Sequence, residues 1–246
     1  MGRGKIIYPN INSQNMVFYY KLWAGPTSPG KVFDYSLNDN LGTLVGTDIH
    51  PTYPGFRFNG TDDYIDTGSP FQSVFRGSFT VHIWIKPDDG QPLAGQFLCG
   101  SRDEVGDDSQ WYIELRTNGT IRFYYESEGN AGTTALTASS QFSDGLAPWT
   151  HIACTADSTI GGPGAKKIFV NGTERTLSGT HDGNTTGVDF TEYTSSINIA
   201  IGAFNKLAGP TDWYGGLIDE TIIYNVAQSA QEIRSIFEST RWRYGV

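Results

Sequence analysis

The sequence predicts an all-β fold in which two antiparallel sheets form a jelly-roll sandwich with one short helix near the C-terminus. Three observations support this prediction. Aromatic residues make up 13% of the chain and there are 30 glycines, a mixture that suits many short strands joined by tight turns. Short apolar runs recur along the chain. Asn-Gly pairs stand between some of these runs or directly after them.

The first 30 residues are predicted to form an arm outside the main domain. They are rich in Pro, Gly and Asn, and they contain one hydrophobic patch, MVFYYKLWAG, at residues 16–25. The breaker cluster AGPTSPG occupies residues 24–30. We therefore expect an N-terminal arm at residues 1–30, whose patch is a strand or packs on a neighbouring molecule, and one domain at residues 31–246.

Strand signals follow at short intervals along the rest of the chain. Each run is rich in β-branched and aromatic residues, and the runs lie at 55–60, 64–68, 77–87, 96–101, 109–119, 120–127, 149–157, 167–172, 196–204 and 216–226. In the run at 77–87, one face carries Phe79, Val81, Ile83 and Ile85. The opposite face includes Trp84, so we expect that face to be partly covered as well.

Two Asn-Gly pairs predict β-hairpins. Asn118-Gly119 separates two of the runs, and Asn171-Gly172 ends another. Asn-Gly is a strong hairpin signal, because both central positions of a type I′ turn need a positive φ.

One helix is predicted near the C-terminus. Ser229 and Glu232 have the spacing of a capping box, in which each side chain bonds to the backbone of the other residue. The apolar residues that follow lie on one helical face: Ile233, Ile236 and Phe237. We expect this helix to pack on the sandwich.

Charge and hydropathy exclude several classes of partner. The net charge of −9 repels phosphate backbones, so we expect no nucleic-acid partner. No stretch approaches the roughly 18 apolar residues of a membrane span, and no apolar core of a secretory signal is present. The two cysteines, Cys99 and Cys154, lie in apolar runs and are interpreted as small core residues.

Six segments of the chain, in order, resemble the laminin-G-like, concanavalin A-like jelly-roll domains. They are FDYSLNDNLGTLVG (33–46), GFRFNGTDDYIDTG (55–68), GSFTVHIWIKP (77–87), PWTHIACTAD (148–157), IFVNG (168–172) and YGGLIDETIIYNVAQSAQEI (214–233). The resemblance extends over residues 31–238 and implies a concanavalin A-like/LamG-like jelly roll. The fold hosts both lectins and glucanases, so the resemblance leaves the activity open.

The adjacent acids Asp219 and Glu220 do not have the spacing of a catalytic pair. Retaining glycosidases need carboxyl groups about 5–5.5 Å apart, whereas neighbours on a strand point to opposite faces. Glu126 and Glu128 are spaced by two, but they stand at a strand end that runs into Gly-Asn. We therefore expect no enzymatic activity, and a glycoside hydrolase is retained only as a minor alternative.

The resemblance implies a structural Ca²⁺ that joins the opening segment to the closing strand. Its side-chain ligands would be Asp34, Asn38 and Asp219, with backbone carbonyls beside them. The alternative is that Asp34 starts an Asx-turn and that Asp219 accepts hydrogen bonds from nearby amides. Glu220 is then expected on the opposite face, partly exposed or paired with a Lys or Arg.

Two polar loops are candidates for ligand binding, because function usually lies on loops of a rigid scaffold. In each loop, acidic residues that can bind sugar hydroxyl groups are close in sequence to aromatic residues that can stack on a sugar ring. The candidate residues are Asp103, Asp107, Asp108, Trp111, Asp212, Trp213 and Tyr214. The alternative is a pair of solvated loops with Trp111 and Trp213 in the core.

The functional prediction is a non-catalytic module, a structural, decorating or adhesion component of a phage particle that binds carbohydrate or a host or particle surface. Domains of the resembled family mostly act outside cells, and a virion protein assembled in the host cytoplasm needs no export signal. Residues 16–25 would then contact virion proteins or further copies of the chain. The alternatives are a stand-alone extracellular lectin-like module and a glycoside hydrolase.

Overall fold

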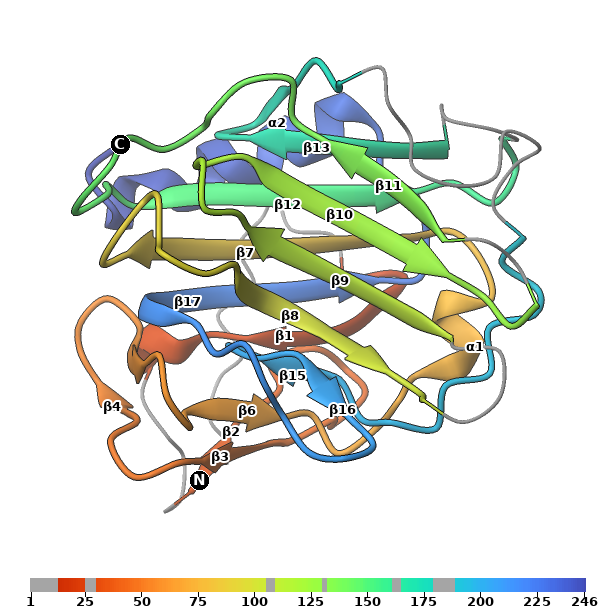
Figure 1. Ribbon diagram of the computed structural model, residues 1–246, viewed down its shortest axis with the longest axis horizontal. Coiled ribbons are helices and arrows are strands. Elements are labelled where there is room, and N and C mark those ends of the chain that lie inside the picture. Colours follow the sequence, from red (N-terminus) through yellow and green to blue (C-terminus); the bar gives the residue numbers. More distant parts are fainter. Residues whose placement is uncertain (1–12, 25–29, 105–108, 130–131, 161–164, 179–188) are drawn as a thin grey trace.

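The computed structural model describes residues 13–24, 30–104, 109–129, 132–160, 165–178 and 189–246. In these residues, two β-sheets pack face to face, and a helix near the C-terminus lies behind one of them (Figure 1). The predicted two-sheet jelly-roll sandwich with one short C-terminal helix is therefore confirmed. None of its described helices is long and apolar enough to cross a membrane.

One sheet, here called the covered sheet, has the order β14-β13-β12-β7-β17-β5-β4, with β1 also paired to β17. All its described pairs are antiparallel. Its strands are β1 (Met16–Tyr20), β4 (His50–Pro51), β5 (Phe56–Asn59), β7 (Phe79–Pro87), β12 (Thr150–Ala156), β13 (Lys166–Val170), β14 (Thr173–Glu174) and β17 (Gly215–Tyr224). Helix α2 (Ala230–Thr240) and a 3-10 turn (Arg241–Arg243) follow β17 and pack on its outer side.

The second sheet, here called the open sheet, has the order β11-β10-β9-β8-β15-β6-β3-β2. Its strands are β2 (Lys31–Val32), β3 (Gly42–Val45), β6 (Tyr64–Asp66), β8 (Gln96–Arg102), β9 (Gln110–Leu115), β10 (Ile121–Glu126), β11 (Thr133–Leu136), β15 (Ala200–Ile201) and β16 (Asn205–Lys206). The short β16 pairs with β8 in parallel, unlike the other pairs of this sheet. No described helix crosses the outer face of β8 to β11 (Figure 1).

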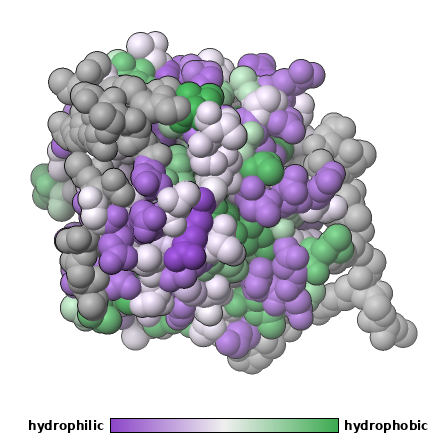
Figure 2. Space-filling model, turned by 90° about the vertical axis from the view of Figure 1, so that its right-hand side faces the viewer, coloured by the Kyte–Doolittle hydropathy of each residue, from purple (hydrophilic) through white to green (hydrophobic). Residues whose placement is uncertain are grey.

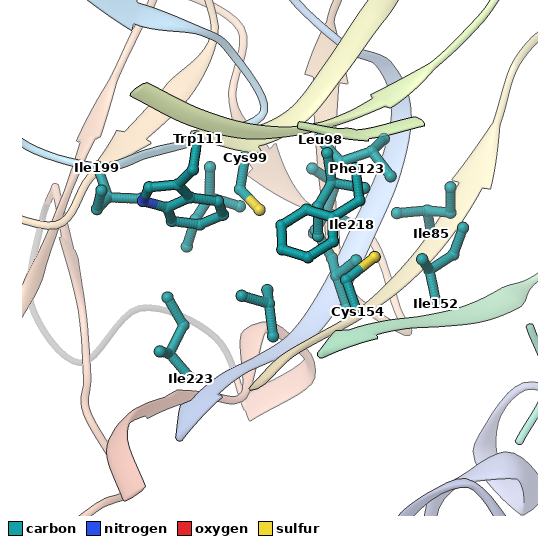
Figure 3. Packing of buried hydrophobic residues seen from close by; sticks show 14 of the residues in the cluster. Ile85, Leu98, Cys99, Trp111, Phe123, Ile152, Cys154, Ile199, Ile218 and Ile223 are labelled. Atoms are coloured by element: carbon teal, nitrogen blue, oxygen red, sulfur yellow. The ribbon is translucent and has the colours of Figure 1, made fainter. Parts of the chain in front are cut away.

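The core lies between the sheets and follows the alternation of the sequence. Phe79, Val81, Ile83 and Ile85 all belong to it, as predicted. Cys99 and Cys154 are buried and free, on facing sheets (Figure 3). Because interdigitated apolar side chains fill this space, ligand chemistry has to lie outside it.

The outer face of β7 is buried beneath the C-terminal segment. The indole of Trp84 donates to Thr240 Oγ1 at 3.1 Å and stacks on Tyr244 at 3.9 Å. A ring nitrogen of His82 lies 2.6 Å from Gln228 Oε1. The partial cover expected over Trp84 is thus present, and α2 with its following turn supplies much of it.

The predicted hairpins and cap are present. Asn171 and Gly172 have φ of 50° and 70° and join β13 to β14. Between β9 and β10 only Gly119 has a positive φ, so this turn is not type I′. Ser229 and Glu232 form the reciprocal capping box at the start of α2.

The N-terminal boundary differs from the prediction. Residues 16–20 form β1, which pairs with the end of β17 and is buried along its length. Phe18 and Tyr20 are fully buried, and Tyr20 donates to the carbonyl of Asn40 at 2.8 Å. Residues 16–24 therefore belong to the sandwich, and an arm covering 1–30 is the wrong division. The patch was misassigned because the Pro- and Gly-rich cluster that follows it in the sequence was interpreted as a domain boundary.

Candidate functional site

Asp34, a predicted calcium ligand, lies in the segment between β2 and β3. Its Oδ1 accepts from the amides of Tyr19 and Ser36, both at 2.8 Å. Its Oδ2 accepts from Ser36 Oγ at 2.7 Å and from the amide of Asn40 at 2.9 Å. The bond to Ser36 N is the Asx-turn named as the alternative, and the bond to Tyr19 ties this loop to β1.

The other two predicted ligands face different partners. Asn38 donates its amide to the carbonyls of Met16 and Val17, at 2.6 and 3.0 Å. Asp219 accepts from Trp23 N at 2.9 Å and from the hydroxyl of Tyr244 at 2.8 Å. Within the described ranges no three His, Cys, Asp or Glu side chains are grouped for a metal. N–H and O–H donors occupy the carboxylate oxygens of Asp34 and Asp219, and Asn38 is itself a donor to backbone carbonyls, so this set does not fit Ca²⁺.

We therefore expect the melting temperature to be insensitive to calcium. An ion bound at one hundred times its dissociation constant adds about 2.7 kcal/mol of stability, which is a rise of roughly 5–10 °C for a chain of this size. Differential scanning fluorimetry with EDTA and with millimolar Ca²⁺ measures the difference. Equal curves are expected, and a rise of several degrees with Ca²⁺ would restore a structural ion.

Asp219 and Glu220 do not point to opposite faces, contrary to the prediction. The pairing of β7 with β17 shifts register between Ile218 and Thr221, where a bulge places both acids on the outer side of the covered sheet. Trp23 shows this directly, because its backbone N–H binds Asp219 while its indole N–H binds Glu220 at 3.2 Å. A bulge cancels the alternation on which the prediction rested.

Both acids are closed off from solvent. Glu220 pairs with Arg243 Nη2 at 2.5 Å and also accepts from the Tyr19 hydroxyl, and each side chain of the ion pair is 1% exposed. The expected pairing of Glu220 with a Lys or Arg is thus present. Burial, and secondly the neighbouring Glu220 charge, raise the pKa of Asp219 to about 7. Carboxyl groups sealed in this way hold the C-terminal turn and offer no access to a substrate.

Among the residues predicted in the loop at 101–111, Trp111 belongs to the core. It is fully buried, and Figure 3 shows its ring pointing between the sheets near Cys99. Phe75 packs on it with ring centroids 4.6 Å apart. The sugar-stacking role predicted for Trp111 is therefore wrong. Asp103 accepts from Ser196 N and Oγ, both at 3.0 Å, while Asp107 and Asp108 lie outside the described residues.

The loop before β17 places its three candidates differently. Tyr214 is fully buried, and its hydroxyl donates to the carbonyl of Leu217 at 3.3 Å, so it cannot contact a ligand. Asp212 is exposed and pairs with Lys206 at 3.5 Å. Trp213 is half-buried, and its indole N–H has no hydrogen-bond partner among the described residues.

Sequence reasoning missed a row of aromatic rings on the outer face of the open sheet. The ring centroids of Phe97 and Phe204 are 4.6 Å apart, those of Phe97 and Tyr112 are 4.8 Å apart, and those of Tyr112 and Tyr124 are 5.0 Å apart. Tyr112 and Phe204 are buried, whereas Phe97 and Tyr124 are half-buried and reach solvent. We call these residues the aromatic row. It crosses β8, β9 and β10 on the face that no described helix covers (Figure 1).

Charged side chains border the aromatic row. The guanidinium of Arg122 lies 5.4 and 5.1 Å from the ring centroids of Tyr112 and Tyr124. Glu126 accepts from the Tyr124 hydroxyl at 3.0 Å, and Glu114 stands opposite Arg122 in the β9–β10 register. The signal was available in the sequence, because alternate residues of QWYIEL and IRFYYE are polar or tyrosine.

The carboxylates of this face are not spaced as a glycosidase pair. Glu126 is opposite Gln110, and Glu114 is opposite Arg122, so the two acids are separated by about four residues along the strands. At roughly 3.4 Å per residue this is on the order of 13 Å, beyond the spacing of about 5–9.5 Å used by retaining and inverting enzymes. The arrangement can bind a polar ligand over apolar rings.

Comparison with known proteins agrees with the fold. Residues 59–234 match the family described as the Concanavalin A-like lectin/glucanases superfamily. No curated protein matches the chain. The chain is similar to the solved structure of Trypanosoma rangeli sialidase in complex with sialic acid, with a TM-score of 0.65 and 18% identity, over 93% of this chain and 33% of that one.

A second similar structure is the binding domain of botulinum neurotoxin DC in complex with rat synaptotagmin II. Its TM-score is 0.66 and its identity 14%, over 93% of this chain and 52% of that one. The chain thus spans about a third to a half of the length of these proteins. At such identities the likeness shows the shared fold alone.

Proposed function

This chain belongs to the concanavalin A-like lectin/glucanases superfamily, and we propose that it is a non-catalytic module that binds carbohydrate on the outer face of its open sheet. The observation that carries the proposal is the aromatic row with its charged border. A sugar has apolar C–H faces and hydroxyl edges. Tyrosine rings supply apolar surface with a polar tip, and Arg and Glu supply hydrogen bonds beside them.

The absence of catalysis is part of the proposal. Glu114 and Glu126 are too far apart to flank one glycosidic bond, and Asp219 with Glu220 is sealed under the C-terminal turn. The glycoside hydrolase therefore remains a minor alternative. Turnover of a bound glycan would be its sign.

The role in a phage particle, and the virion or extracellular location, remain predictions from the sequence. The patch at 16–25 does not support them, because β1 is buried in its own sandwich. Figure 2 shows one end of the molecule, where hydrophilic and hydrophobic residues are interspersed among the coloured atoms. The binding proposal requires neither a particle nor an oligomer.

Replacing Tyr124 by Ala is expected to weaken glycan binding at least tenfold, because the half-buried ring at the end of the aromatic row is lost. The measurement is a glycan array, followed by titration of the strongest hit by isothermal calorimetry. Tyr53→Ala is the matched control, because Tyr53 is 72% exposed and follows β4 of the other sheet. Silence of the wild-type protein on the array, or equal affinities of wild type and Tyr124→Ala, would overturn the proposal.

A further inference from the structure

Glu114 and Arg122 lie opposite each other on the outer face of the open sheet, and no direct hydrogen bond joins their side chains. They are direct cross-strand partners of β9 and β10. Glu114 Oε2 lies 3.8 Å from Arg122 Nη1, which is within ion-pair distance but too long for a hydrogen bond. The guanidinium has a long contact of 3.4 Å to Thr134 Oγ1. The two side chains therefore form an ion pair with no direct hydrogen bond between them.

Both groups contain a buried atom that lacks a partner. Glu114 Oε2 and Arg122 Nε are shielded from solvent, and neither has a hydrogen bond within the described part of the chain. Burial raises the pKa of Glu114 although the Arg122 and Arg116 charges oppose the shift. The two side chains as a whole remain partly exposed, at 12% for Glu114 and 26% for Arg122, so a ligand can reach the rest of each group.

We infer that the Glu114–Arg122 pair recognises two adjacent hydroxyl groups of a neutral sugar, an inference that rests on the proposed function and names the chemistry of its ligand. A hydroxyl both donates and accepts, so one can donate to the Glu114 carboxylate while its neighbour accepts from the Arg122 guanidinium, each at the part of the side chain that reaches solvent. A sugar carboxylate or sulfate would suit Arg122 but be repelled by Glu114. An amine would meet the reverse conflict. The rings of Tyr112 and Tyr124 lie beside Arg122 to receive the C–H face.

Gly95 positions the Glu114 carboxylate. A methyl group at position 95 would lie 2.3 Å from Glu114 Oε1, so any other residue pushes the carboxylate aside. The backbone of Gly95 is outside the left-handed region, so Ala is sterically compatible with it. The clash falls on the end of a flexible side chain. Gly95→Ala is therefore a variant that moves the recognition group without removing its charge.

The test uses soluble polysaccharides of defined chemistry: dextran, mannan and galactan, each native or oxidised with periodate and then reduced with borohydride. Periodate cleaves the carbon–carbon bond of adjacent diols, so the treated polymers lose the recognised group. Polygalacturonate, which carries carboxylates, is compared with galactan. We expect the wild-type chain to bind at least one native neutral polymer, to lose at least tenfold in affinity after periodate, and to bind polygalacturonate more weakly than galactan.

Three variants test whether binding depends on Glu114, on Arg122 and on the position of the Glu114 carboxylate. Glu114→Gln, Arg122→Lys and Gly95→Ala are each expected to bind the chosen native polymer at least tenfold more weakly, with melting temperatures close to wild type. Equal binding of native and periodate-treated polymer, or wild-type affinity in Gly95→Ala and Glu114→Gln, would overturn this inference and leave the proposed function standing. Binding of none of the native or charged polymers would overturn both.

Discussion

Replacing Arg243 by Met is expected to lower the free energy of unfolding by about 3–5 kcal/mol. Arg243 and Glu220 form an ion pair in which both side chains are 1% exposed. Removing the guanidinium leaves the Glu220 charge buried without its ion-pair partner. Tyr19 and Trp23 still donate to it but are neutral, and Lys21 is the cation that remains nearby. The loss of stability is measured by urea denaturation at pH 7, with far-ultraviolet circular dichroism to follow the sandwich.

A second variant distinguishes two contributions to the loss of stability: the cost of leaving Glu220 buried without a partner, and the net stabilisation that the ion pair provides. The double variant Glu220→Gln/Arg243→Met removes both charges, so most of the lost stability should return. Matched surface pairs such as Arg57–Asp88, whose side chains are about 40% exposed, should cost at most about 1 kcal/mol when Arg57 is replaced. A loss below 1 kcal/mol in Arg243→Met would contradict the conclusion that the buried Arg243–Glu220 pair holds the C-terminal turn on the sandwich.

Local signals in the sequence were sufficient to predict most of the fold. The face formed by Phe79, Val81 and Ile83 is core because alternate residues of a strand share a side. Ser229 with Glu232 predicted the start of α2, because a capping box depends on residues only three positions apart. Such features need only neighbouring residues, so they can be read without the tertiary structure.

Features that depend on strand register or on contacts between distant residues could not be predicted from the sequence alone. The bulge at Ile218–Thr221 turns Asp219 and Glu220 to one side, and nothing local marks it. The burial of β1 depends on pairing with β17, about 200 residues later.

The candidate site could be predicted from the sequence only in part. Trp111 alternates with Tyr112, so an odd–even assignment along β9 would have placed the first in the core and the second outside. The prediction instead grouped Trp111 with the preceding loop. The opposition of Glu114 to Arg122 depends on the register of a hairpin whose turn deviates from the expected type, so it required the structure.

Asp219→Asn is expected to stabilise the protein at pH 7–8 and to do so progressively less toward pH 4. The folded-state pKa of Asp219, about 7, lies above its ordinary value of 3.8. The folded chain therefore binds this proton more tightly than the unfolded chain does. The stability this group contributes is fully present below pH ~4 and is lost as the pH rises through 7. Asn retains an acceptor for Trp23 N and never ionises.

The difference between the two unfolding free energies should grow from pH 4 to 7 by an amount on the order of 2–4 kcal/mol, and level off above pH 7.

The two proteins have to be compared with each other because the titration of His82 changes stability with pH in the opposite direction. Burial lowers the pKa of His82 to about 4, so its contribution is lost as pH falls from 6.5. His82 is present in both proteins, and its effect cancels in the difference. Glu220, Arg243, Lys21 and Tyr244 face the same buried cluster in both. Parallel stability curves for wild type and Asp219→Asn would show that Asp219 is ionised throughout, with Arg243 neutralising both acids.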